Sequence, residues 1–362
     1  MYRSRLCLPL ANKNFRYTIF FGRLLKSHCY FTIKHLRRHN SRHSFNCFAV
    51  GVFSYEKLFK RRQKKMTTTI NPNQNLDTKD CINPMDVAHE ITESVMPSKA
   101  NYRKSKTFVL AIAAGALIAF GAQVSLNVMT GTEQVSWGIA KLVGAMTFAT
   151  GLMMVVLTGA ELFTGNVMMT FAVIEKKTSL MKLLRNWSIV YCGNFVGSII
   201  LAALIYFSGC SHNAHDALGV MGLMTAYNKV NLTVVEAFTR GILCNWLVCL
   251  AIWMASSSRH VIGKIFAIFF PIMTFVASGY EHSIANMYFI SNGLFLKNIP
   301  SVVAASGLTP EQLSTLSVKS FLLSNLLPVT LGNIVGAFVF VVLLFWTAYL
   351  RDDHTHGKHH KA

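Results

Sequence analysis

A glutamate and a histidine stand side by side in one of the most apolar parts of the chain, within GYEHSIAN from Gly279 to Asn286. Ionisable side chains are costly inside a membrane and tend to mark pathways for ions or substrates. An imidazole can be neutral or charged near physiological pH, so His282 could hold an anion or pass it a proton. A hydrogen-bonded core histidine is the structural alternative, and we favour the functional interpretation.

A second stretch, GAELFTGN, repeats the pattern G-x-E-x-x-x-x-N. The pattern aligns Glu161 with Glu281, and it aligns Leu162 with His282. A symmetric pair of glutamates suits a structural role, in which each carboxylate accepts hydrogen bonds from backbone N–H groups that are freed where a helix unwinds. Cation binding by these carboxylates is the alternative. His282 has no counterpart in the other half, which makes it the stronger functional candidate.

The same repeat extends to further polar positions. Asn166 and Asn286 close the two patterns, and the next apolar region after each carries GNFVG and GNIVG respectively. The asparagines of these two later motifs, Asn194 and Asn333, are expected to form hydrogen bonds between helices. Their glycines are expected to let helices approach closely.

The composition predicts the elements that position these residues. Hydrophobic residues make up 52% of the 362 positions, only 14% are charged, and the mean hydropathy is +0.40. This balance excludes an ordinary soluble domain and predicts an all-α polytopic membrane protein. Six apolar regions are candidate spans: 107–128, 138–174, 187–208, 233–257, 261–296 and 321–349.

The second and fifth regions are too long for simple spans. Each has about 35 residues, roughly 50 Å if helical, and carries a glutamate and glycines near its middle. We predict that both helices are broken inside the membrane. With three spans in each half, the second copy enters from the opposite face, so the repeat is inverted. Inverted repeats with broken helices place a binding or conduction site near the membrane midplane.

The formal net charge of +20 is concentrated at the N-terminus. Residues 1–65 hold sixteen Lys or Arg and a single acid, Glu56. This basic extension shows no nucleic-acid-binding motif, and three interpretations remain: an over-extended translation start before Met66, a transit peptide, or a cytosolic arm. We expect residues 66–106 to form a cytoplasmic region with a short amphipathic helix in MDVAHEITESV. Residues 107–350 are expected to form the transmembrane domain, and residues 351–362 a His-rich cytoplasmic tail.

The positive-inside rule predicts the orientation. Six spans put both termini on one side, and the segments on that side carry most of the Lys and Arg, including Lys176, Lys177, Lys182 and Arg185. Both termini are therefore expected in the cytoplasm of a cell whose plasma (inner) membrane holds the protein. The eight cysteines show no metal-ligand spacing, and the tail histidines are expected to be solvated. No cofactor or metal site is predicted.

Four stretches together resemble the formate/nitrite transporter family: GAELFTGNV, GILCNWLVCLAIW, FVASGYEHSIANMYFI and NLLPVTLGNIVG. The resemblance covers about Met85 to Asp352. The long loop expected from Ser291 to Lys319 and the ending YLRDDHTH look most like the formate channels of this family. The resemblance implies an aquaporin-like bundle of six spans, assembled as a homopentamer with one pore in each protomer. A cytoplasmic formate-producing lyase is a further partner that the resemblance suggests.

The resemblance also implies roles for individual residues. His282 matches the central histidine, with Thr164 within hydrogen-bonding reach, while Asn245 matches a pore-facing asparagine and Lys229 an outer lysine that draws anions. Arg240 departs from the family pattern, in which an apolar residue is expected. The resemblance implies two constrictions: one on the cytoplasmic side, formed by Leu152, Leu162, Phe163 and Val248, and one on the outer side, formed by Phe148 and Phe275.

These features predict passage of formate or a related small monovalent anion, with proton coupling at His282. Whether His282 donates a proton or only supplies a positive field stays open. Nitrite or hydrosulfide transport through the same pore is the alternative within the family. A neutral-solute channel is disfavoured by the lack of an Asn-Pro-Ala pair at the breaks. A membrane enzyme with Glu281 and His282 as acid and base is disfavoured because no nucleophile or cofactor loop accompanies them.

Overall fold

The computed structural model describes residues 81–132 and 134–351. The basic extension 1–65, the segment 66–80 and the tail 352–362 lie outside the described residues, so the expectations about them stay predictions. The described part is all helical apart from loops and one isolated bridge between Cys81 and Ser258.

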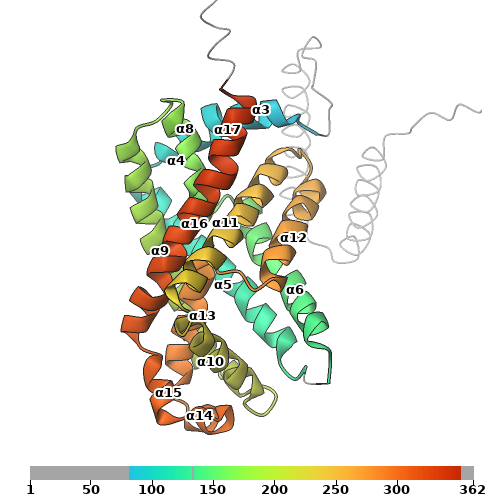
Figure 1. The fold of residues 1–362 in the computed structure, drawn as a ribbon, viewed down its shortest axis with the longest axis vertical. Helices are drawn as coiled ribbons and strands as arrows, with labels where there is room; N and C mark the ends of the chain where they lie inside the picture. The colour runs from blue at the N-terminus through green and yellow to red at the C-terminus, as the bar shows by residue number, and fades with distance from the viewer. Residues whose placement is uncertain (1–80, 133, 352–362) are drawn as a thin grey trace, which may run out of the picture. The chain divides into compact units, whose positions relative to one another are not determined.

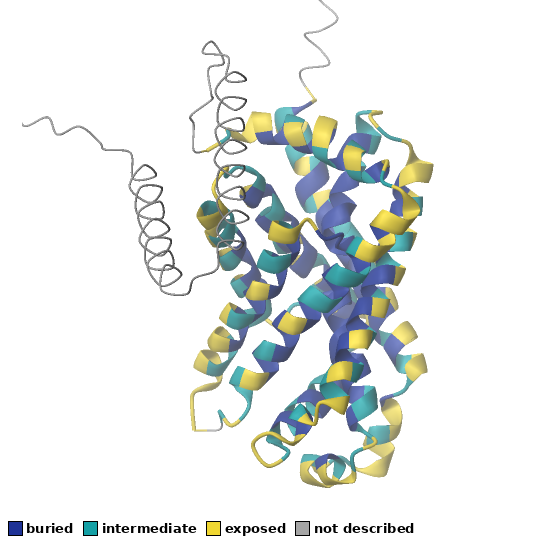
Figure 2. Cartoon of the chain, turned by 180° about the vertical axis from the view of Figure 1, so that it is seen from behind, coloured by how far each residue is buried: buried dark blue, intermediate teal, exposed yellow. Residues whose placement is uncertain are grey.

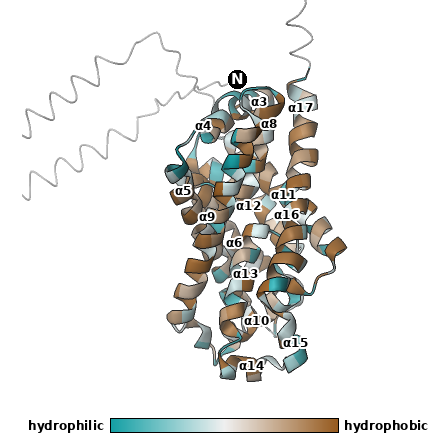
Figure 3. Ribbon diagram, turned by 90° about the vertical axis from the view of Figure 1, so that its left-hand side faces the viewer, coloured by the Kyte–Doolittle hydropathy of each residue, from teal (hydrophilic) through white to brown (hydrophobic). Residues whose placement is uncertain are grey.

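Five helices in the described part are long and apolar enough to cross a membrane. They are α5 (Lys104–Met129), α6 (Trp137–Thr158), α9 (Leu180–Phe207), α11 (Val234–Ser256) and a continuous helix Ser320–Tyr349 that comprises η4 (Ser320–Leu326), α16 (Leu327–Ala337), η5 (Phe338–Leu343) and α17 (Leu344–Tyr349). Hydrophobic residues predominate along these helices (Figure 3). Buried residues line the inside of the bundle, and exposed large apolar residues lie on its outside, as expected for a lipid-facing surface (Figure 2).

The second and fifth spans are interrupted, as predicted. The second consists of α6 followed by α7 (Phe163–Asn166), η2 (Val167–Met169) and α8 (Thr170–Ile174). The fifth consists of α12 (Val261–Ala277) and α13 (Ser283–Leu296). A glycine with left-handed backbone follows each helix: Gly159 (φ 70°) comes directly after α6, and Gly279 (φ 72°) comes after α12 and its C-cap Ser278. Only glycine adopts this conformation without steric strain, so these two residues stop the helices.

Helices of the two halves pack in the same way. α5 lies against α9 in the first half, and α11 lies against α16 in the second. An added Cβ at Gly197 would lie 2.0 Å from the Ile112 carbonyl oxygen, and one at Gly336 would lie 2.2 Å from the Ile242 carbonyl oxygen. Both glycines therefore permit direct contact between helix backbones, which confirms the predicted packing role.

Replacing Gly197 by Ala should lower the free energy of unfolding by about 1–3 kcal/mol, because the new methyl group meets backbone that cannot move aside easily. The thermal stability of the purified protein in detergent measures this effect. Gly138→Ala is the matched control, since an added Cβ there meets nothing within 4 Å. Equal stability of the two variants would contradict the close-packing role.

The segment before α5 is helical as well. It consists of α3 (Pro84–His89), η1 (Glu90–Val95) and α4 (Met96–Ala100), and Asn83 caps its start by accepting a hydrogen bond from the backbone N–H of Asp86. Apolar side chains of this segment, such as Ile91, pack with Phe171 of α8 and Val341 of η5. The N-terminal segment thus lies at the same end of the bundle as α8 and α17 (Figure 1).

The opposite end of the bundle carries helices that the sequence did not predict. η3 (Cys210–His212) and α10 (Ala217–Val230) connect α9 to α11, while α14 (Pro300–Ser306) and α15 (Pro310–Thr315) precede the last span. α13 continues to Leu296, so the connection expected from Ser291 begins later and contains two short helices. The proline at N1 of each short helix and the Thr309–Gln312 capping box explain why these helices form.

Candidate functional site

One asparagine holds each helix break. Asn194 of α9 donates from Nδ2 to the carbonyl oxygens of Ala111 (2.8 Å) and Glu161 (2.9 Å), and its Oδ1 accepts the backbone N–H of Phe163 (2.9 Å). The amide therefore satisfies two backbone groups of the break, the Glu161 carbonyl and the Phe163 N–H, and ties them to the carbonyl of Ala111 in the unbroken helix α5. Such groups need partners inside a membrane protein, where water is scarce.

Asn333 of α16 makes the same three bonds in the second half. Its Nδ2 donates to the carbonyl oxygens of Gly241 (2.8 Å) and Glu281 (3.0 Å), and its Oδ1 accepts the backbone N–H of Ser283 (2.9 Å). The GNFVG and GNIVG motifs thus repeat in sequence because each supplies the side chain that ties one break to its neighbouring helices.

The two glutamates bind side chains rather than the freed backbone N–H groups that we had expected. Asn166 donates to Glu161 (2.7 Å), and Asn286 donates to Glu281 (2.6 Å). The backbone N–H groups of Phe163 and Ser283 are taken by Asn194 and Asn333, and those of the glutamates themselves by backbone carbonyls of α5 and α11, so these groups are not available to the carboxylates. Both carboxylates are buried, Glu161 at 1% and Glu281 at 5% exposure, so each needs a compensating charge.

A lysine supplies that charge in each half. Lys99 of α4 lies 3.0 Å from Oε1 of Glu161, and Lys229 of α10 lies 2.8 and 2.9 Å from the two oxygens of Glu281. Lys99 was missed in the sequence because it lies outside the repeated spans. The repeat nevertheless indicates that a cation should pair with Glu161, because a second buried glutamate requires a second compensating charge.

Replacing Lys229 by Met should lower the free energy of unfolding by roughly 3 kcal/mol, because it leaves the Glu281 carboxylate buried and unpaired. The double variant Lys229→Met with Glu281→Gln should recover most of this loss, since a neutral amide can keep the contact with Asn286. Thermal stability in detergent is the measurement. A double variant no more stable than the single one would show that charge pairing is not what stabilises this site.

His282 lies at the start of α13 and is 3% exposed. Its Nδ1 accepts the backbone N–H of Ala285 (3.1 Å), and its Nε2 lies 2.8 Å from Oγ1 of Thr164 across the break. Because Nδ1 accepts a hydrogen bond, it carries no proton, so the neutral imidazole carries its proton on Nε2. The structure thus brings His282 and Thr164 together and assigns the imidazole tautomer.

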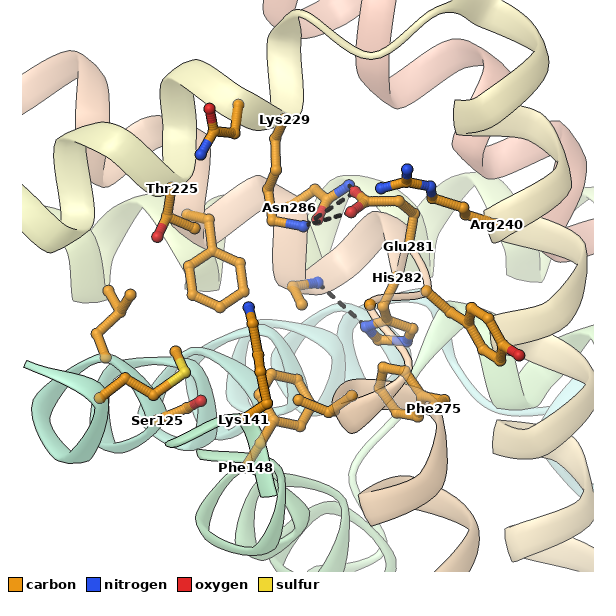
Figure 4. A pocket seen from close by; sticks show the side chains of 18 of the residues that line it. Ser125, Lys141, Phe148, Thr225, Lys229, Arg240, Phe275, Glu281, His282 and Asn286 are labelled. Atoms are coloured by element: carbon orange, nitrogen blue, oxygen red, sulfur yellow. Dashed lines mark hydrogen bonds and ion pairs between the residues drawn. The ribbon is translucent and has the colours of Figure 1, made fainter. Parts of the chain in front are cut away.

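The bundle holds two cavities, and His282 lines the first of them. The first, here called the α10-side cavity, is about 240 Å³ in volume. Figure 4 shows its lining, with Lys229, Glu281 and Asn286 at one end and His282 near Phe275 at the other. The second, here called the α4-side cavity, is about 720 Å³ in volume and is bordered by Lys99 and Glu161.

Apolar side chains separate the cavities. Phe148 and Phe275 line the α10-side cavity and meet edge to face, with ring centroids 5.7 Å apart. Leu152 and Leu162 line the α4-side cavity. A bare anion crossing this layer would lose its hydration. His282 lines the α10-side cavity next to Phe275 of this layer, with Thr164 as its buried hydrogen-bond partner.

Four of the predicted pore residues, Thr164, Phe163, Val248 and Asn245, lie outside the lining of both cavities. The Phe163 ring packs against Tyr191 of α9, with ring centroids 5.0 Å apart, and Val248 is buried in the core. Asn245 donates to the carbonyl oxygens of Thr164 (3.2 Å) and Asn333 (2.8 Å). Asn245 thus links the short helix after the first break to α16 rather than lining a cavity, because backbone carbonyls of Thr164 and Asn333 hold its amide.

The fold and the two cavities define a polytopic membrane transport protein, and comparison with known proteins gives its family. A model of the formate/nitrite transporter family matches residues 86–347. The formate channel FocA of Escherichia coli (strain K12) is 40% identical over 269 residues, covering 74% of this chain and 94% of FocA. A probable formate transporter of Methanothermobacter thermautotrophicus is 40% identical over 286 residues, covering 74% of this chain and 97% of that protein.

Among solved structures, a pentameric formate channel with formate bound matches with a TM-score of 0.63 and 38% identity, over 68% of this chain and 98% of that chain. The chain belongs to the formate/nitrite transporter family. It is a transporter and not an enzyme, and the predicted aquaporin-like architecture of two inverted repeats is confirmed.

Proposed function

We propose that this protein is a membrane channel for formate and related small monovalent anions, with proton coupling at His282. The observation that carries the proposal is the single imidazole, bonded to Thr164, beside an apolar layer between two cavities. The relatives described above are named as formate channels or transporters, which supports formate as the substrate.

The apolar layer explains why a proton is needed. Phe148, Phe275, Leu152 and Leu162 offer no hydrogen bonds to a charged carboxylate, so a bare anion is strongly disfavoured there. A weak acid that gains a proton crosses as a small neutral molecule. Formic acid suits this layer because it is small and readily formed from its anion.

His282 is placed to deliver that proton. In this scheme the imidazole first gains a proton from water in the cavity, which displaces the Ala285 N–H from Nδ1. The charged ring then passes its Nε2 proton to an oxygen of the anion and becomes neutral, with the remaining proton on Nδ1. Loss of that proton to water and return of a proton to Nε2 restore the starting tautomer. Thr164 Oγ1, at 2.8 Å, orients Nε2 during this exchange.

The assembly and orientation form part of the same proposal. A homopentamer with one pore in each protomer is supported by the pentameric relative. The excess of Lys and Arg at the α4 end supports an orientation with that end and both termini in the cytoplasm and the α10-side cavity facing outward across an inner (plasma) membrane. A formate-producing lyase in the cytoplasm would then meet the α4 end.

A competition assay in proteoliposomes tests the substrate. Formate, nitrite, lactate and hydrosulfide fluxes are compared at two pH values, and we expect formate to pass fastest and to gain most from a proton gradient. Nitrite or hydrosulfide passing faster than formate would instead favour the alternative within the family. Vesicles without protein and vesicles with an unrelated channel are the controls.

A further inference from the structure

Arg240 marks a difference between the two halves of the repeat. The Glu281 backbone N–H donates to the Arg240 carbonyl oxygen, and the Glu161 backbone N–H donates to the Leu110 carbonyl oxygen, both at 3.2 Å. Arg240 and Leu110 are therefore equivalent positions. The second half has a guanidinium where the first half has an apolar side chain.

The Arg240 side chain borders the α10-side cavity. Figure 4 shows it extending from α11 toward the Glu281 end of that cavity. Lys141 of α6 and Lys229 of α10 also line the cavity, so three cations accompany one carboxylate, Glu281. Glu281 is already bound by Lys229 through both oxygens, which leaves the charges of Lys141 and Arg240 uncompensated within the cavity.

The Arg240 guanidinium makes one weak side-chain contact within the described part of the chain. Within residues 81–132 and 134–351, its side-chain partner is Glu236, at 3.5 Å and one helical turn away. The other oxygen of Glu236 is held by Thr233 in the capping box of α11. Arg240 is 39% exposed in its side chain, so most of its five N–H donors remain available to a ligand.

We propose that Arg240 is an anion-capture and specificity residue in the α10-side cavity, where it binds planar anions with two oxygens before they reach His282. The guanidinium presents two parallel N–H donors that match the two oxygens of a carboxylate or of nitrite. Hydrosulfide has a single acceptor atom, its sulfur, and cannot form this paired contact. This inference rests on the proposed transport of small anions and adds a selectivity step to it.

The test is formate flux in right-side-out and inside-out membrane vesicles. Arg240→Leu, which copies Leu110, should raise the KM about tenfold for entry from the α10 side, the loss expected for one charge-assisted contact in a wet cavity. The KM for entry from the α4 side and the maximal rate should not change. The dependence of entry on ionic strength should also weaken, because one steering charge is removed.

Arg240→Lys keeps the positive charge but removes the planar guanidinium group, so it tests the two properties separately. It should keep the ionic-strength dependence but lose the preference for formate over hydrosulfide, because an ammonium group cannot form the paired contact. Lys319→Leu is the matched control, since Lys319 is an exposed cation at the same end but outside the cavity. Its KM should equal that of the wild type.

The outcomes distinguish this inference from the proposed function. An unchanged α10-side KM in Arg240→Leu, in a protein that carries formate, would overturn the inference alone. Absence of formate flux in the wild type would contradict formate as the substrate. In that case the KM for nitrite, which also has two oxygens in one plane, is compared between the wild type and Arg240→Leu to decide the role of Arg240. An equal rise in KM from both sides would also overturn the inference, because it would indicate a general structural change.

Discussion

Replacing His282 by Asn is expected to abolish the pH dependence of formate flux while leaving the fold intact. Asparagine is a good helix N-cap, so its side-chain oxygen can accept the Ala285 N–H that Nδ1 now accepts. The amide has no group that titrates between about pH 5 and pH 8, the range over which an imidazole changes charge. Proteoliposome uptake across this range measures the effect, and the ratio of acid to neutral flux should fall to about 1.

Two further variants separate the parts of the imidazole. His282→Ala removes the cap as well as the ring and should additionally cost about 1 kcal/mol of stability. Thr164→Val keeps the imidazole but leaves Nε2–H without its hydroxyl partner, so pH dependence should persist with altered rates. Full wild-type pH dependence in His282→Asn would rule out proton coupling at this residue.

The second large effect is expected at Asn333. Leucine has a similar volume but no polar atoms, so Asn333→Leu leaves the buried Glu281 carbonyl oxygen and Ser283 N–H of the break without this partner. The Gly241 carbonyl oxygen lies within α11 and keeps its helical hydrogen bond. Each stranded group costs roughly 1–3 kcal/mol, which gives an expected loss of about 4 kcal/mol in stability. Thermal unfolding of the purified protein in detergent should reveal it, accompanied by loss of transport.

The equivalent variant in the first half is the internal comparison. Asn194→Leu removes the same three bonds from the other break and should destabilise by a similar amount. Asn333→Asp keeps the acceptor for Ser283 N–H but loses the donors, and should be nearly as harmful because it buries a charge. A stable, active Asn333→Leu protein would show that the break is held by other contacts.

The architecture could be predicted because it depends on local features. The length of each apolar run sets the spans, since a helix must cover a fixed hydrocarbon thickness. The over-long second and fifth runs, with Gly159 and Gly279 inside them, predicted the breaks, because glycine alone adopts the left-handed backbone easily. The repeated motifs then revealed the inverted halves and singled out His282.

The partners of the polar residues could not be predicted in the same way. Glu281 was correctly expected to be buried, but its bonds to Lys229 and Asn286 depend on how α10 and α13 pack together. Lys99 reaches Glu161 from a helix outside the spans. Such contacts join residues far apart in the chain, and no local period records them.

The sequence by itself determined which residues are apolar, where the helices must stop, and that His282 lacks a twin. Only the tertiary structure decided what these residues face. It turned Phe163 toward α9 and Asn245 toward backbone carbonyls, and it set Arg240 at the wall of a cavity. The physical reason is that helix formation follows from the residues of one segment, whereas a side chain's surroundings follow from the packing of several segments at once.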